Sequence, residues 1–180
     1  DGEKALIFTW LGGSGKSTLA SAFRTKKHFT ILSDNYCLVH EDHMYPFPEL
    51  PRITKETAGL LNIEEWKKAD GIKSYLENTL QWVKDSYPIS SVFFCSYSEG
   101  DFQMNPIENT DDIYEYISAI NHYTKEFPEY LNLALLSFLS EYNTTKIRHE
   151  NLSVFAKKNH FYFLENSKEI EKNLDRILNV

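Results

Sequence analysis

The sequence contains little cysteine and no long apolar run. Its two cysteines, Cys37 and Cys95, lie far apart in 180 residues, which disfavours a disulfide framework or a zinc site and fits two ordinary buried thiols in a reducing compartment. No run approaches the roughly 18 uncharged apolar residues of a membrane span, and Asp1-Gly2-Glu3-Lys4 does not open like a signal peptide. We therefore expect a cytoplasmic protein with no membrane partner.

Basic residues are also in the minority, because 19 Lys+Arg stand against 26 Asp+Glu and leave a net charge of −7. This excess of acidic residues leaves no basic stripe that could bind the phosphates of a nucleic acid, so we expect no nucleic-acid partner. The apolar fraction of 42% and the charged fraction of 25% are ordinary for a folded chain and disfavour disorder. The length predicts one domain over residues 1–180, and the start without Met leaves room for an upstream segment.

Short apolar runs alternate with helical spacing along the chain, which predicts an α/β sheet with flanking helices. The run at 92–95 is apolar on both faces and is the predicted central strand. Asn62 with Glu65, and Asn166 with Glu169, have the form of capping boxes that begin helices. The predicted strands are residues 5–9, 29–32, 36–39, 92–95 and 161–164, and the predicted helices are residues 16–23, two between 62 and 83, 111–120, 131–139 and 166–178.

Three of the seven glycines lie close together at residues 12–15, within the segment Trp10-Leu11-Gly12-Gly13-Ser14-Gly15-Lys16-Ser17. This segment occupies the frame of G-x-x-x-x-G-K-[ST] between a predicted strand and a predicted helix. Backbone N–H groups there can surround a β-phosphate, Lys16 can reach the β- and γ-oxygens, and the Ser17 hydroxyl can ligate Mg²⁺. A glycine-serine turn that merely caps a helix is the alternative. The predicted nucleotide-binding residues are Gly12, Gly13, Ser14, Gly15, Lys16, Ser17 and Thr18.

One position departs from the phosphate-loop pattern, because Trp10 stands where the first glycine belongs. If that site requires a positive φ, the indole is expected to strain the loop or to lean over the nucleotide pocket. Gly12 and Gly13 lie close by and could adopt part of the turn that the loop requires. Phosphate binding therefore remains the leading interpretation.

The order of the motifs resembles the HPr kinase-like P-loop proteins, which are similar in fold to the ATP-dependent phosphoenolpyruvate carboxykinases. The resemblance rests on the loop, on residues 29–35 (FTILSDN), on Tyr45-Pro46-Phe47-Pro48, and on the later segments 92–94, 99–100, 105–107 and 161–165. Only the loop is a specific motif. The resemblance implies a P-loop kinase-like fold with ATP and Mg²⁺ as cofactors, and it covers most of the chain loosely.

The resemblance also implies that Asp34 is the carboxylate that faces the transferred phosphoryl group. Such a group could accept the proton of an attacking hydroxyl or hold Mg²⁺, so Lys16 and Asp34 are the predicted catalytic residues and Ser17 and Asp34 the predicted metal ligands. Ordinary turn chemistry is the alternative for Asp34. The family often has a second acidic residue where this chain has Asn35, and the E-I-R-G-L-G-I segment of HPr kinase/phosphorylases has no counterpart.

Other polar residues carry weaker signals. Arg52 could approach phosphate, although a surface arginine is the simpler interpretation, and Glu49 is a weak metal candidate. His40 and His43 lie three apart in a predicted loop, where solvated histidines are expected in preference to zinc ligands.

Three functions are compatible with these residues. The leading hypothesis is a kinase that moves the γ-phosphoryl group of ATP to a hydroxyl, with a serine of a protein or peptide as one acceptor. A nucleotide-binding regulatory module that has lost turnover is the second, suggested by Trp10 and Asn35. A small-metabolite kinase is the third, because the loop identifies the phosphoryl donor and not the acceptor.

Overall fold

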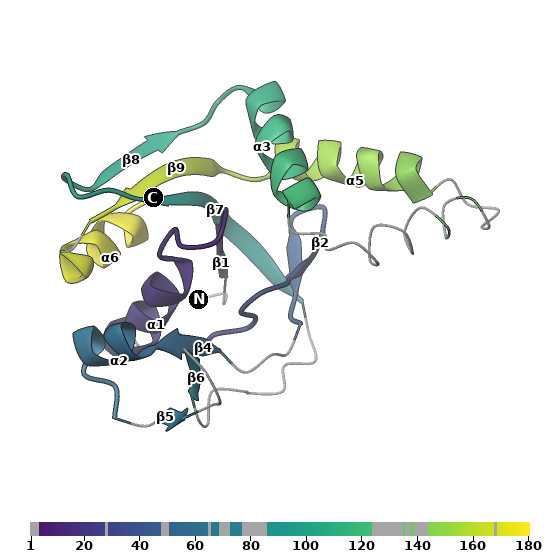
Figure 1. Cartoon of the computed structure of the whole chain (residues 1–180). Helices are drawn as coiled ribbons and strands as arrows, with labels where there is room; N and C mark the ends of the chain where they lie inside the picture. Colours follow the sequence, from purple (N-terminus) through teal and green to yellow (C-terminus); the bar gives the residue numbers. More distant parts are fainter. Residues whose placement is uncertain are drawn as a thin grey trace.

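The computed structural model describes residues 4–27, 29–47, 51–64, 66–68, 73–76, 86–123, 135, 138, 144–167 and 169–180. It has a mixed α/β architecture, in which helices flank a six-stranded mixed sheet and a three-stranded sheet lies beside it (Figure 1).

The middle of the larger sheet is β7 (Tyr87–Tyr97), which pairs in parallel with β1 (Ala5–Thr9) on one side and β9 (Phe161–Asn166) on the other. The register places Phe8 opposite Phe93 and Phe93 opposite Tyr162. These rings form a stacked row across the three strands, with centroids 5.3 and 5.4 Å apart. The predicted central strand is therefore confirmed.

Antiparallel strands complete the larger sheet. The strand β8 (Gln103–Pro106) pairs with β9 at one edge. A hairpin of β2 (Leu38–His40) and β3 (His43–Tyr45) meets the first residues of β7. The sheet is thus parallel at its centre and antiparallel at its margins.

Helices cover both faces of this sheet, which explains why β7 is apolar on both sides. Phe93 faces α1 (Lys16–Lys27) and α6 (Ile170–Leu178), and it is completely buried. Phe94 is equally buried but faces α3 (Thr110–Tyr123) and α5 (Thr144–Lys158). The expected burial of residues 92–95 on both faces is confirmed.

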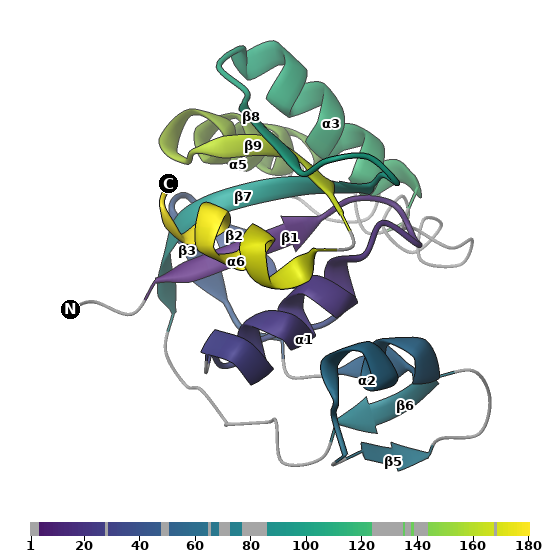
Figure 2. The ribbon, with the colours of Figure 1, turned by 90° about the vertical axis from the view of Figure 1, so that its left-hand side faces the viewer.

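The smaller sheet has the order β4-β6-β5, with β4 (Arg52–Thr54), β6 (Lys73–Leu76) and β5 (Trp66–Lys68) all antiparallel to their neighbours. The short helix α2 (Lys55–Leu61) follows β4 directly and lies beside α1 (Figure 2). Ile53 and Leu61 join the core beneath α1, so this unit packs against the face that carries the glycine loop.

Several sequence-based predictions need correction. Residues 29–32 are not a strand, because they run without regular pairing from α1 toward the hairpin. Asn62 ends α2 in the left-handed conformation (φ 53°) and does not begin a helix. Asn166 belongs to β9, and the N-cap residue Glu169 makes no side-chain capping bond.

The predicted helix across residues 72–83 is wrong where it can be compared, because residues 73–76 form β6 and residues 77–83 lie outside the described part. The predicted helix at 131–139 lies outside the described residues except for positions 135 and 138, which are helical. The sequence patterns did not indicate β8 or α5. None of the helices in the described ranges is both long and apolar enough to cross a membrane.

Candidate functional site

The glycine loop connects the carboxyl end of β1 to the first turn of α1. Gly13 and Gly15 adopt positive φ angles of 80° and 82°, which glycine reaches without the steric cost that other residues pay. The Gly15 carbonyl accepts the first helical hydrogen bond from Leu19 N at 2.9 Å. The loop therefore delivers the first-turn N–H groups and the positive end of a twelve-residue helix to the edge of the sheet, which favours anion binding.

The side chain of Lys16 folds back across this loop. Its Nζ donates to the Leu11 carbonyl at 2.7 Å and to Ser14 Oγ at 3.0 Å, and Ser14 is itself buried. A phosphate bound in the loop would compete with these two oxygens for the ammonium group. The ammonium group of Lys16 therefore lies against the loop that the sequence predicts to bind phosphate.

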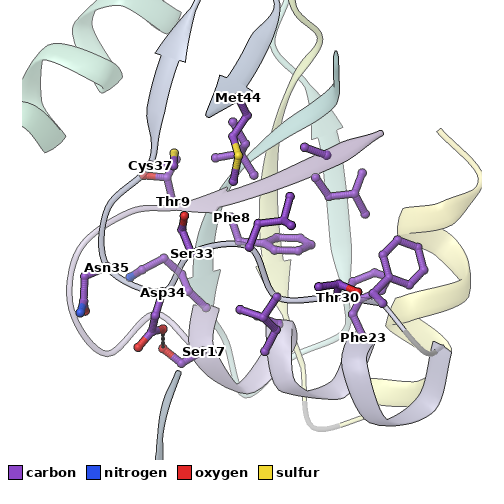
Figure 3. Close-up of a pocket in the computed structure, with 18 of the residues that line it drawn as sticks. Phe8, Thr9, Ser17, Phe23, Thr30, Ser33, Asp34, Asn35, Cys37 and Met44 are labelled. Atoms are coloured by element: carbon purple, nitrogen blue, oxygen red, sulfur yellow. Dashed lines mark hydrogen bonds between the residues drawn. The ribbon is translucent and has the colours of Figure 1, made fainter. Parts of the chain in front are cut away.

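Asp34 lies at the same helix end. Ser17 Oγ donates to Asp34 Oδ1 at 3.4 Å, and the backbone N–H of Arg52 donates to Asp34 Oδ2 at 3.1 Å (Figure 3). The half-buried carboxylate is thus held between the loop and the start of β4. The expected proximity of Asp34 and Ser17 is found, but it does not come from strand pairing with β1, since residues 29–32 form no strand.

A cavity of about 180 Å³ opens between β1, α1 and residues 29–37. Figure 3 shows Ser17, Asp34 and Asn35 at one end and Phe23 with Thr30 toward the other. The cavity therefore has an apolar interior and a polar end at the loop.

Trp10 lies away from this cavity. Its φ of 138° confirms that the position requires the conformation favoured by glycine, which costs a tryptophan on the order of 1–3 kcal/mol. The indole packs edge-on against Phe94 and Tyr116, with ring centroids 5.7 and 5.6 Å away, and it does not line the cavity. The ring therefore extends into the core beneath α3, and the expectation that it leans over the pocket is not supported.

Replacing Trp10 with glycine is expected to lower stability and to leave nucleotide affinity unchanged. Loss of the aromatic contacts outweighs relief of the strained φ, so we expect the free energy of unfolding to fall by about 1–3 kcal/mol. Urea denaturation and calorimetric ATP titration measure the two effects. Trp10→Phe is the control, since it keeps an aromatic ring at the strained position. Tighter ATP binding by Trp10→Gly would show that the indole does obstruct the site.

Near the loop, the sequence analysis predicted Thr18 as a nucleotide-binding residue but did not identify its partner Thr57, and it took Asn166 only for a helix cap. Thr18 Oγ1 lies 3.0 Å from the Oγ1 of Thr57 in α2, and Thr57 N donates to the N-cap hydroxyl of Thr54 at 3.2 Å. Two buried asparagines, Asn166 and Asn173, lie where β9 ends and α6 passes. Lone threonines and asparagines have no diagnostic spacing, so only the folded arrangement identifies them.

The other candidate residues from the sequence analysis do not contact the glycine loop through their side chains in the described part of the chain. It is the backbone of Arg52 that contacts Asp34, and Glu49 lies outside the described residues. His40 and His43 were predicted to lie in a loop, but they are opposite each other in the β2–β3 hairpin. In the described ranges, no group of three or more histidine, cysteine, aspartate or glutamate side chains is placed to hold a metal ion.

Both cysteines are poor nucleophiles. Burial raises the pKa of Cys37 to about 11 and that of Cys95 to about 12, and for Cys95 the nearby charge of Lys16 opposes the rise only in part. Each thiol is therefore protonated at neutral pH.

Comparison of the chain with protein-family models, with curated proteins and with solved structures gives no significant match.

Proposed function

We propose that this chain is an HPr kinase-like phosphotransferase, which binds ATP at the glycine loop and moves its γ-phosphoryl group to a hydroxyl. The observation that carries the proposal is the meeting of Lys16, Ser17 and Asp34 at the first turn of α1. A cation, a hydroxyl and a carboxylate at a helix N-terminus are the groups that phosphoryl transfer from a nucleotide needs.

The loop would bind the phosphates through the backbone N–H groups of residues 12–16 and through the Lys16 ammonium. Lys16 would exchange the Leu11 carbonyl and the Ser14 hydroxyl for phosphate oxygens, which carry more charge and accept stronger hydrogen bonds. The hydroxyl of Thr18 is engaged with Thr57, so this side chain anchors α1 to α2 and only its backbone N–H is available to a nucleotide.

The site also fits Mg²⁺. Ser17 Oγ and Asp34 Oδ1 are hard oxygen donors at the edge of the loop, and Mg²⁺ commonly takes one or two protein oxygens together with phosphates and water. Bound MgATP would supply the electrophilic γ-phosphoryl group and neutralise part of its charge.

Asp34 is the residue best placed to accept the proton of the attacking hydroxyl. Its Oδ2 is held by the Arg52 N–H, whereas Oδ1 is held only by the longer contact with Ser17. The carboxylate is thus oriented by the backbone, and when Mg²⁺ is held by Ser17 Oγ and the phosphates its Oδ1 can take the proton of the attacking hydroxyl. The acceptor would be a protein, a peptide or a small molecule that reaches the polar end of the cavity.

Incubation with γ-labelled ATP, Mg²⁺ and candidate acceptors tests the proposal. Transfer of label to a protein, peptide or small-molecule hydroxyl supports a kinase and identifies the acceptor class. ATP binding without transfer or hydrolysis supports the second candidate, a nucleotide-binding module. Asn35 favours that candidate, because the amide that follows Asp34 cannot act as a second base.

Lys16→Ala is expected to weaken ATP binding by about 10- to 150-fold. The estimate follows from the loss of a charge-assisted hydrogen bond worth about 1.5–3 kcal/mol. Isothermal titration calorimetry measures it. Lys26→Ala removes the same charge from the other end of α1 and is the matched control. Equal ATP affinity in wild-type and folded Lys16→Ala protein would exclude this loop as the nucleotide site.

A further inference from the structure

The cavity beside α1 continues beyond the glycine loop. Every residue of β1, together with Lys4 before it, lines the cavity on one side, and residues 29–37 line it on the other. In the described part of the chain, its charged lining residues are Lys4, Lys16 and Asp34. Lys16 and Asp34 lie at the loop, whereas Lys4 precedes β1 at the opposite end. The space between these two ends is therefore bounded by uncharged groups.

Apolar side chains at the margin of the core face this space. Leu6, Phe8 and Ile31 line the cavity and pack against the core, yet each is only partly buried. Phe29 is 37% exposed, and its ring lies edge-on to that of Phe23 with centroids 5.2 Å apart. Apolar surface left beside a cavity favours a ligand that removes it from water, and aromatic rings favour another ring.

The size of the cavity favours a compact ligand. Its volume of about 180 Å³ is close to that of the roughly 150 Å³ apolar cavities that bind a benzene molecule in other proteins. A single ring with a short substituent fits a space of this size.

The polar end of the cavity is where a substituent on such a ring would react. Ser17 Oγ donates to Asp34 Oδ1 at that end, and Phe8 lies between this pair and Phe23 in Figure 3. A hydroxyl carried by a ring that packs against Phe8 would therefore meet the Asp34 carboxylate. An apolar interior with a few polar groups that fix the orientation of the ligand is typical of small-molecule sites.

We propose that this cavity is the acceptor subsite, and that the acceptor is a small aromatic alcohol whose ring lies along β1 and whose hydroxyl lies at Asp34. This assignment rests on the proposed function and names its substrate class. The hydroxyl oxygen forms a bond to the γ-phosphorus of ATP while the bond from that phosphorus to the β,γ-bridging oxygen breaks. The hydroxyl proton passes to Asp34 and then to water, so the products are a phosphate monoester and ADP.

Ala20 is the residue whose enlargement tests this subsite. It lines the cavity from α1, one turn after Lys16, and it is partly buried. Leucine at this position adds three carbon atoms beside the cavity and changes no charge or hydrogen-bonding group of the loop. Ala119→Leu makes the same change at a partly buried position of α3, which covers the other face of the sheet, and is the matched control.

Ligand-observed NMR with benzyl alcohol measures binding, and γ-labelled ATP with benzyl alcohol measures formation of labelled benzyl phosphate. We expect the wild-type protein to bind benzyl alcohol and to transfer the label to it. Ala20→Leu is expected to weaken benzyl alcohol binding by about tenfold or more and to leave ATP affinity unchanged, because the added side chain takes the space of the ring and not that of the phosphates. Ala119→Leu is expected to retain both ligands. Thermal melts show whether each variant folds, and Ala20→Val is the smaller replacement.

The outcomes separate the two proposals. If the wild-type protein binds benzyl alcohol but not ATP, the proposed function falls and the acceptor role falls with it. If it transfers label to a serine or tyrosine peptide but does not bind benzyl alcohol, only the acceptor assignment is refuted. Binding of both ligands without transfer to benzyl alcohol would also overturn the acceptor role.

Two further results would overturn the position of the ligand. Displacement of benzyl alcohol by adenosine would mean that the cavity holds the nucleoside of ATP. Equal binding of benzyl alcohol by the wild-type protein and by folded Ala20→Leu protein would place the ring outside this cavity.

Discussion

Asp34→Asn is expected to lower phosphoryl transfer by about 10²-fold or more while leaving ATP affinity largely intact. The amide keeps an oxygen that can accept from the Arg52 N–H, so the loop and β4 remain connected. It cannot take a proton from an attacking hydroxyl, and loss of a general base typically costs about 10²- to 10⁴-fold in rate. The effect should therefore fall on kcat.

Initial rates with labelled ATP and calorimetric titration measure the two quantities for Asp34→Asn. Asp112→Asn neutralises an exposed carboxylate in the first turn of α3 and is the matched control. Phosphoryl transfer at the wild-type rate would mean that Asp34 only holds the start of β4 in place. Loss of ATP binding together with transfer would make it primarily a ligand of the metal-nucleotide complex.

Phe93→Ala is expected to lower the free energy of unfolding by about 3–5 kcal/mol, a large part of the stability of a domain this size. Phe93 is completely buried at the middle of the aromatic row, between Phe8 and Tyr162. The row continues into α1, because Phe23 stacks on Phe8 with centroids 5.5 Å apart. Removing the central ring leaves a cavity beneath the helix that carries the loop.

Urea denaturation measures this change, and Tyr97→Ala is the control on the same strand. Tyr97 is 49% exposed, so its removal is expected to shift the midpoint far less. A similar loss from both substitutions would indicate that β7 is stabilised by its backbone pairing and not by its position between the helical layers.

The parallel core could be predicted because its sequence pattern and its environment agree. β1, β7 and β9 contain the continuous apolar runs 5–8, 92–95 and 161–164, and helices with apolar faces follow or precede them, as strands covered on both sides require. The loop was predictable as well, since Gly13 and Gly15 take the positive φ angles that glycine reaches most easily.

Residues 29–32 show why an apolar β-rich run need not be a strand. Ile31 packs toward the core under α1 and Leu32 toward the opposite core, so the alternation of side chains is kept. Phe29 packs its ring against Phe23 and donates its N–H to the Phe23 carbonyl, which ties the segment to the end of α1. The apolar pattern therefore indicated that side chains of this segment pack against the core. The contacts with α1 take the place of pairing with a neighbouring strand.

The predicted strand at 36–39 overlaps β2, but the turn and β3 were missed because the turn lacks the usual residues. Glu41 takes a positive φ of 55° where asparagine or glycine is common. Contacts from α5 hold it there, since Lys158 Nζ lies 2.8 Å from Glu41 Oε2 and Asn159 Nδ2 donates to the Glu41 carbonyl. The hydrogen bond from Lys158 lowers the pKa of Glu41. A turn stabilised from a distant helix leaves no local signal.

The hydrogen bond from Arg52 to Asp34 connects the smaller sheet to the carboxylate beside the loop. Backbone amides exchange with solvent when the segment that protects them opens, and such openings occur in cooperative groups. The Arg52 amide belongs to β4, yet its acceptor is the carboxylate beside the loop, and Thr57 adds a second connection to Thr18. Opening of β4 and α2 away from α1 would therefore separate Asp34 from the Arg52 N–H, which is one of its two donors. The local stability of the three-stranded sheet then determines how long the carboxylate keeps its orientation.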